Sequence, residues 1–303
     1  MNHCKGRRLR ATANARKQVE RFEIVEQSRK TRTGSENSTK LAGGDVNVRR
    51  QISCMSLLSL VVAVSGVTAQ TGTTVPAVET IIARIAQARD ENRQRFRPYI
   101  VTREYQLFGK ERQNIKSQVT AEVTFVPPDS KKYAFQKSSG AGLGGRIVGR
   151  MLESEAEIAK NYCSTDISLN NYDFRFIREE ELAGRRCYVL ELNPRRKEKN
   201  LVRGNIWVDA DTYLVHRTEA EPAKSLSWWV RDVHMVFLYG DVEGMWLQMA
   251  SEATATVRIL GQHTIISRNV KYEIDKLVAA RAKQALQIDI QRPVQRLDPS
   301  SSK

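Results

Sequence analysis

The sequence predicts a mainly β domain with added helices (α+β), in which a curved antiparallel sheet carries a helix from its N-terminal side. Three observations predict this class: apolar and polar residues alternate in a series of short segments, turn residues separate these segments, and one earlier segment has a helical apolar period. Alternation with a period of two is what a half-buried strand requires. Successive hairpins with one polar face form an antiparallel sheet.

Residues 184–222 show this architecture most plainly. Residues 187–192 place Tyr188, Leu190 and Leu192 on one side of a strand, which Pro194 ends. A basic loop follows, and two more apolar runs, 205–208 and 213–217, flank the turn residues Asp209 to Thr212. Two hairpins in tandem make a meander.

The other expected strands follow the same rule. The clearest is 117–126, with Val119, Ala121, Val123 and Phe125 on one face, and it is followed by a turn at 127–129. Further strands are expected from Tyr99 onward and at 131–137, 172–176, 229–239, 245–259 and 263–274.

The order of these parts resembles a known family. A strand G-x-x-x-Y-V-L-E-L, a basic loop, then G-x-I-W-V-D and V-x-R-x-E is similar to the bacterial outer-membrane lipoprotein-sorting proteins, the superfamily of the LolA carrier, the LolB receptor and the lipid-binding domain of RseB. The resemblance covers residues 75–275. It implies a half-open antiparallel β-barrel with a helical lid over an apolar cavity that holds acyl chains. Its motifs are structural, so the shared fold leaves the ligand open.

The N-terminal residues 1–47 predict a disordered basic extension. Residues 1–50 hold thirteen Lys or Arg against five Asp or Glu and show no apolar period. One interpretation is a basic arm for nucleic acid or anionic lipid. The other, which the following segment favours, is an upstream stretch included by a start codon assigned too early.

Residues 48–69 carry the three regions of a secretory signal: Arg49 and Arg50, an apolar run over 55–64, and small residues before a cleavage point near Ala69. An uncleaved anchor is disfavoured, because residues 52–69 fall short of the ~20 apolar residues that span a bilayer. We therefore expect an exported, periplasmic protein whose mature form lacks residues 1–69.

Export changes what the charge implies. Of the formal charge of +15, residues 1–50 account for +8, and the remainder keeps 36 basic against 29 acidic residues. A moderately basic envelope protein meets anionic phospholipid head groups or acidic surfaces, so transient contact with a membrane surface is expected and nucleic acid is not.

Two helices are expected beside the sheet. In residues 75–97 the apolar positions Val78, Ile81, Ile82, Ile85 and Ala86 recur with a helical period and predict a stripe that lies on the sheet. Residues 139–160 contain Gly140, Gly142 and Gly145, which satisfy G-x-G-x-x-G. A dinucleotide site is rejected there because that motif requires a parallel βαβ unit. The segment instead predicts a glycine hinge followed by a lid helix over 147–160.

The strand faces that alternate inward, together with the lid helix, predict the wall of a ligand cavity. Its expected lining residues are Val123, Phe125, Tyr133, Phe135, Ile147, Leu152, Phe174, Phe176, Leu190, Phe237, Leu247 and Met249. A barrel of this size can also be filled by its own side chains. Cavity and solid core therefore both remain open.

Other chemistry is weakly indicated. Cys163 and Cys187 are either a disulfide pair or two free thiols in an oxidising compartment. The histidines lack metal-ligand spacing with these cysteines. Asp209 and Asp211 flank a turn, where carboxylates cap backbone N–H groups, and Asp232 with His234 suggests a surface pair. Trp228 and Trp229, if extended, would point to opposite sides of the chain.

We therefore expect residues 70–275 to form one non-enzymatic domain that binds a lipid, an acyl chain or a lipoprotein without a cofactor or metal. Residues 276–303 are expected to form a short helix and a flexible tail. An alternative is an envelope-stress sensor or partner-binding domain resembling RseB, and a more distant one is an exported hydrolase. A carrier predicts a continuous apolar cavity, a sensor an exposed patch on the sheet or its loops, and a hydrolase a buried acid–base pair.

Overall fold

The computed structural model describes residues 75–274 without residues 111 and 141, together with residues 278 and 280. Within these residues, one sheet carries two α-helices and a turn of 3-10 helix. The helices are α2 (Val78–Gln94), α3 (Leu143–Lys160) and η1 (Tyr162–Ser164). The strands are β1 (Tyr99–Phe108), β2 (Ile115–Val126), β3 (Ser130–Gly140), β4 (Tyr172–Leu182), β5 (Arg185–Pro194), β6 (Val202–Asp209), β7 (Val215–Pro222), β8 (Val230–Val242), β9 (Met245–Val257) and β10 (Gly261–Glu273).

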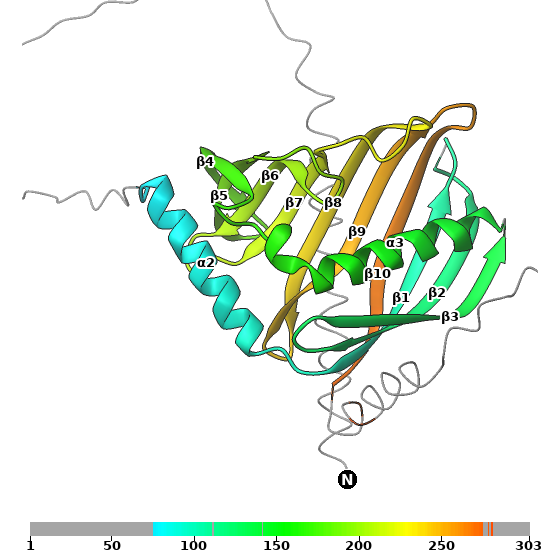
Figure 1. The fold of residues 1–303 in the computed structure, drawn as a ribbon, viewed down its shortest axis with the longest axis horizontal. Coiled ribbons are helices and arrows are strands. Elements are labelled where there is room, and N and C mark those ends of the chain that lie inside the picture. The colour runs from blue at the N-terminus through cyan, green and yellow to red at the C-terminus, as the bar shows by residue number, and fades with distance from the viewer. Residues whose placement is uncertain (1–74, 111, 141, 275–277, 279, 281–303) are drawn as a thin grey trace, which may run out of the picture.

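The ten strands form one continuous antiparallel sheet in the order β3-β2-β1-β10-β9-β8-β7-β6-β5-β4. The first and last strands, β1 and β10, pair in its interior, so β3 and β4 become the two edges and the sheet does not close. The sheet curves around α2 and α3, which lie on the same face (Figure 1). This is the half-open antiparallel fold that the sequence predicts.

Alternation along the strands sorts side chains between the two faces as expected. Tyr188, Leu190 and Leu192 of β5 are buried with α2 in one cluster. Val189, the residue between them, is buried in a separate cluster with Trp207. The period of two therefore separated the two faces as predicted, but the second face, expected to be polar, is also buried at this point.

Helix α2 lays its apolar stripe on the sheet, and Ile81, Ile82 and Ile85 are buried. Its C-terminal end is fixed by Asn92, whose side chain accepts a hydrogen bond from the backbone N–H of Trp246 (2.7 Å) and donates one to the carbonyl of the same residue (2.9 Å). Apolar packing and a paired amide therefore hold α2 to the sheet along its length.

Helix α3 begins at Leu143, four residues earlier than the predicted start at Ile147. The predicted hinge is shortened accordingly, because Gly145 lies inside the helix and Gly142 is its N-cap residue. Gly144 explains the difference: a Cβ there would lie 2.2 Å from Ser117 Oγ on β2. The glycines therefore permit close packing of the first helical turn on the sheet.

The expectation that Trp228 and Trp229 point to opposite sides is wrong. Both residues lie in the turn before β8, and their rings stack with centroids 4.1 Å apart at 26°. The expectation assumed an extended backbone, which a turn does not provide.

Several predicted segments lie outside the described residues: the basic extension 1–47, the signal 48–69, and the tail 276–303 apart from the helical residues 278 and 280. In the part of the chain that the structure describes, no helix combines the length and apolarity needed to cross a membrane.

Candidate ligand-binding site

The candidate site is organised around a charged residue on the inward face of β1. Along this strand Val101, Arg103, Tyr105 and Leu107 alternate inward, and all four are buried. Arg103 is only 5% exposed. A guanidinium in an otherwise apolar row requires partners, because burying an unpaired charge is strongly unfavourable.

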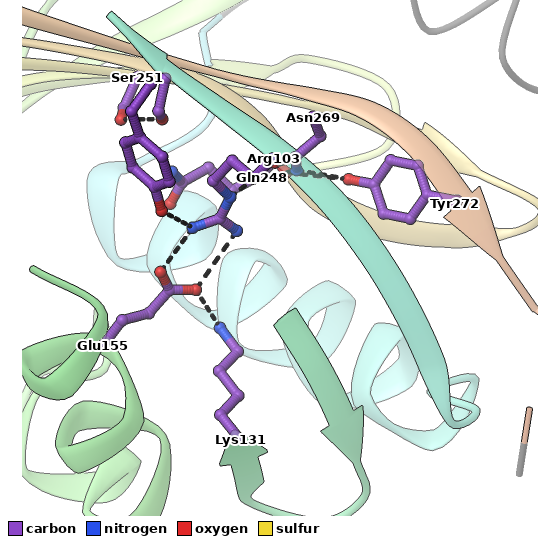
Figure 2. Close-up of polar contacts among 9 residues, drawn as sticks. Arg103, Lys131, Glu155, Gln248, Ser251, Asn269 and Tyr272 are labelled. Carbon is purple, nitrogen blue, oxygen red and sulfur yellow. Dashed lines mark hydrogen bonds and ion pairs between the residues drawn. The ribbon is translucent and has the colours of Figure 1, made fainter. Parts of the chain in front are cut away.

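Two elements far apart in the sequence supply those partners (Figure 2). Glu155 of α3 accepts from Arg103 Nη1 at 2.6 Å and from Lys131 Nζ of β3 at 2.5 Å. On the sheet, Arg103 Nε donates to Asn269 Oδ1 at 2.7 Å. Asn269 in turn donates to the backbone carbonyl of Gln248 at 2.7 Å. This ion cluster, Arg103, Lys131 and Glu155, ties α3 to two strands of the sheet, β1 and β3.

Electrostatics keep Glu155 ionised in this position. Burial alone would raise the pKa of the Glu155 carboxyl, but the charges of Lys131 and Arg103 outweigh burial and hold that pKa well below its usual range. The cluster therefore remains an ion pair network at every physiological pH.

A cavity of about 250 Å³ adjoins the ion cluster, between the C-terminal ends of α2 and α3 and the sheet. Its apolar wall is formed by Phe96, Tyr99, Val101, Phe125, Trp246 and Leu247. The charged lining residues are three cations, Arg93, Arg103 and Lys131, and one carboxylate, Glu155. The cavity therefore combines an aromatic wall with an excess of positive charge.

The position of Arg93 is fixed by an aromatic contact. Its guanidinium lies 3.4 Å from the centre of the Tyr162 ring in η1, and it donates to the carbonyl of Pro128. Contacts of this kind orient a cation without neutralising its charge. Arg93 therefore keeps its positive charge at the edge of the cavity.

The structure divides the twelve residues predicted to line a cavity. Val123, Phe125, Leu152, Leu247 and Met249 are buried in the cluster beneath α3, with Tyr133 and Ile147 packed against it. Leu190 is buried in the separate cluster beneath α2, against which Phe174 and Phe176 pack. Of the twelve, Phe125 and Leu247 line the cavity itself. A role in binding stays a prediction for the whole set.

Two predicted residues lie apart from both clusters. Phe135 is 48% exposed on the edge strand β3, where its ring lies against Gly149 of α3. Phe237 of β8 is half-buried. Neither belongs to the cavity wall described above.

The ion cluster and a binding role for the aromatic residues Phe96, Tyr99 and Trp246 were not predicted from the sequence. One signal was present: Arg103 occupies an inward position between Val101 and Tyr105. A charge in the apolar register of a strand indicates either a functional site or a buried partner elsewhere in the chain.

The other candidate groups do not form a reactive site. Cys163 is exposed and Cys187 is buried, and both are free thiols, so the disulfide considered from the sequence is not formed. Burial raises the pKa of the Cys187 thiol to about 12, which keeps it protonated. Asp232 and His234 are both exposed at an irregularity of β8. Among the described residues, no group of three or more His, Cys, Asp or Glu is placed to hold a metal.

The predicted capping role of Asp209 is confirmed. Its Oδ1 accepts from the backbone N–H groups of Asp211 (3.0 Å) and Thr212 (2.7 Å). Its Oδ2 lies 3.4 Å from His216 Nε2 and 3.3 Å from Arg185 Nη1. This carboxylate therefore orders the β6–β7 turn.

Comparison with known proteins gives a family model described as "Uncharacterized protein", which matches residues 158–276. No curated protein matches the chain. A solved domain of an outer membrane lipoprotein-sorting protein from Vibrio parahaemolyticus is similar, with 16% identity, a TM-score of 0.39, and coverage of 63% of this chain and 91% of that chain. A LolA superfamily protein from Nitrosomonas europaea shows 11% identity, a TM-score of 0.38, and coverage of 67% and 95%.

The MucA/MucB complex of Pseudomonas aeruginosa is also similar, with 11% identity, a TM-score of 0.20 and coverage of 67% and 95%. One of the similar structures is described as a LolA superfamily protein, the group that the sequence resembles.

Proposed function

We propose that this chain is a non-catalytic binding protein of the cell envelope that takes up a lipid, an acyl chain or the lipid of a lipoprotein beneath α3. The observation that carries the proposal is the composition of the cavity: an aromatic and aliphatic wall beside three cations and one carboxylate. That composition fits an amphiphile with an apolar chain and an anionic head group, since apolar walls with a few placed polar groups bind such ligands.

The size of the cavity bears on how a ligand enters. At about 250 Å³ it is smaller than the ~300–1,000 Å³ typical of small-molecule sites. A long acyl chain therefore requires α3 to move away from the sheet and to expose the apolar residues beneath it. Such a movement breaks the ion cluster and the hydrogen bond from the Tyr133 hydroxyl of β3 to Glu153 Oε1 of α3 (3.1 Å).

A ligand carboxylate or phosphate can replace Glu155 as the counter-ion of Arg103 and Lys131. The guanidinium then stays paired when α3 moves, and the cost of an unpaired buried charge is avoided. In this mechanism Glu155 acts as an internal competitor for the ligand head group. The head group and the helix therefore exchange places on the same two cations.

Binding of cis-parinaric acid and of its methyl ester, followed by fluorescence, tests the proposal. The acid is expected to bind at least about tenfold more tightly, equivalent to ~1.4 kcal/mol, which is the scale of a hydrogen bond to a charged group. Lys131→Met should remove most of this preference without changing ester binding. Lys137→Met, on the exposed part of the same strand, is the matched control.

Glu155→Gln sharpens the test, because it removes the competing carboxylate. We expect tighter binding of the acid together with lower thermal stability, whereas Glu157→Gln, two residues further along α3 at an exposed position, should change neither. Equal binding of acid and ester by the wild type, or no binding of either, would contradict the proposal.

The alternative of partner-protein binding has its own supporting observation. Strand β3 is an edge of the sheet, and its last seven residues are exposed. An open edge accepts an added strand from another chain. A proline in place of Ala134 should then abolish capture of a partner while leaving parinaric acid binding intact.

A further inference from the structure

The largest group of exposed apolar side chains in the described residues lies at one end of the sheet. It consists of Leu226, Trp228 and Trp229 before β8, and Ile259 and Leu260 in the β9–β10 turn. The two turns are neighbours, because Val257 of β9 pairs both with Val230 and with Gly261. The β9–β10 turn projects at the upper end of the sheet in Figure 1. We call these five residues the apolar tip.

The tip is an ordered surface. The stacked rings of Trp228 and Trp229 are 64% and 47% exposed. The backbone N–H of Arg258 donates to the Trp229 carbonyl at 2.8 Å, and its guanidinium lies 5.5 Å from the Trp228 ring centre. These contacts join the two turns, so the aromatic rings and the hairpin are presented together.

Ile259 is an unusual residue for a hairpin turn. It is 91% exposed and has a φ of 139°, a positive value that is unfavourable for a β-branched side chain. Glycine or asparagine is the ordinary choice in a hairpin turn. Strained, exposed apolar residues without contacts inside the fold indicate a contact outside it.

The charges around the tip indicate the chemistry of that contact. The β1–β2 turn lies at the same end of the sheet, since Phe108 pairs with Thr264. It contributes Lys110 and Arg112, Lys116 lies at the start of β2, and Lys224, Arg231 and Arg258 lie in or beside the tip. Among the described residues, Asp232 lies in β8 near the tip, and the carboxylate of Glu252 is paired with Arg112 at 2.7 Å. The end of the sheet is therefore apolar at its centre and positively charged around it.

We propose that the apolar tip docks on the surface of a bilayer that contains anionic phospholipids. Stacked tryptophans suit the head-group level, where an apolar ring and a polar N–H are both satisfied. Ile259 and Leu260 enter the acyl boundary, as the apolar faces of interfacial segments do. The surrounding cations contact lipid phosphates, each adding to the attraction of a negatively charged leaflet.

This inference is independent of the ligand in the cavity. The tip lies at the Val257 end of β9, whereas Trp246 and Leu247 of the cavity lie near the other end. Eleven residues of strand separate Trp246 from Val257, or about 35 Å at ~3.3 Å per residue. The tip therefore holds the protein on the membrane with the cavity away from the bilayer.

Vesicle flotation of the full chain tests the inference, with large unilamellar vesicles of phosphatidylethanolamine and phosphatidylglycerol. Trp228→Ser/Trp229→Ser and Ile259→Ser/Leu260→Ser should each lower the partition coefficient about tenfold, equivalent to ~1.4 kcal/mol. Leu169→Ser removes another exposed leucine, at 54% exposure and outside the tip, and should have no effect. All samples share residues 1–69, so any contribution of that segment is common to them.

A second measurement locates the contact. Vesicles with brominated acyl chains should quench the tryptophan fluorescence of the wild type but not the residual fluorescence of Trp228→Ser/Trp229→Ser, which retains Trp207 and Trp246. Replacing phosphatidylglycerol by phosphatidylcholine should weaken binding by the wild type. Equal partitioning of the tip variants and the wild type would overturn the inference. So would a concentration-dependent dimer that the tip variants lose, because the tip would then bind a second copy.

Discussion

The two helices lie on the same face of the sheet but are held there in different ways. Beneath α2, in what we call the α2 half (α2 with β4–β7), Leu190, Leu192 and Ile206 are fully buried against Ile81. Beneath α3, in the α3 half (α3 with β1–β3, β9 and β10), the buried cluster adjoins a cavity that is lined in part by the buried, charged side chain of Arg103.

The different contacts beneath the two helices indicate which part of the fold can change shape. Apolar contacts are lost together when a packed helix leaves its sheet, and nothing in solution replaces them. An ion pair can instead be exchanged for one with another anion, at a cost that depends on the ligand. The α3 half is therefore suited to binding, and the α2 half to holding the curved sheet in place.

The largest expected effect concerns packing density in the two halves. Leu190→Ala in the α2 half should lower the free energy of unfolding by about 2–5 kcal/mol, the range for a leucine removed from a solid core. Leu247→Ala in the α3 half should cost clearly less, because Leu247 lines the cavity and already lacks neighbours on one side. Urea denaturation of both variants measures the difference. Equal losses would contradict the distinction between the halves.

The same comparison explains which parts of the fold could be predicted from the sequence. Alternation found the strands of both halves, and the helical period found the stripe of α2, because these are local patterns. The ion cluster is not local: Glu155 and Arg103 are 52 residues apart, and they meet only because α3 lies across β1. On its own helix Glu155 looks like any residue of a solvated face.

The prediction for the tryptophan pair was wrong for a related reason. The backbone of a turn, which decides where Trp228 and Trp229 point, depends on how β8 enters the sheet. Four of the five tip residues belong to segments that the sequence analysis placed in strands, residues 229–239 and 245–259, or next to them. The exposure of these side chains at the end of the sheet therefore could not be predicted before the pairing of the strands was known.

The second prediction uses the different pH ranges in which buried groups of the two halves lose their stabilising contribution. His216 of β7 is 2% exposed, and burial lowers its pKa from 6.5 to about 4. In the unfolded chain His216 therefore becomes protonated below about pH 6.5. In the folded chain it becomes protonated only near pH 4. The contribution of neutral His216 to the free energy of unfolding is fully present above this window. It is lost as the pH drops through the window, by up to about 3 kcal/mol.

Urea denaturation across this pH window checks the prediction for His216. His216→Asn should flatten the dependence whatever its effect at neutral pH, and His234→Asn, at an exposed position, should preserve it. Glu155 should contribute mainly below this window, because its carboxyl takes up a proton near its ordinary pKa of 4.5 in the unfolded chain but only at lower pH in the folded chain, so its stabilisation is lost from about pH 5 downward. A steep loss between pH 6.5 and pH 4 that survives in His216→Asn would show that another group controls the acid response.

The smallest expected effect concerns how closely α3 approaches the sheet, and neighbouring glycines provide the comparison. Both Gly144 and Gly145 lie in the first turn of α3, so alanine brings the same gain in helix propensity at each position, at most ~1 kcal/mol. At Gly145 the added Cβ would meet its nearest atom, Ser138 Oγ, at an ordinary 3.7 Å. At Gly144 it would lie 2.2 Å from Ser117 Oγ and 2.6 Å from Ser117 Cβ.

Gly145→Ala should therefore leave stability unchanged or raise it slightly, whereas Gly144→Ala should lower it by about 1–3 kcal/mol, the usual cost of overpacking. The strain acts where α3 meets β2, so Gly144→Ala should also increase amide hydrogen exchange in α3 while leaving α2 protected. If α2 and α3 lose protection together, the two halves unfold as one unit, and α3 cannot move as an independent lid. If neither variant changes the exchange of α3, the helix is not held by close packing at Gly144, and the ion cluster and the buried side chains of Val148 and Leu152 determine its position.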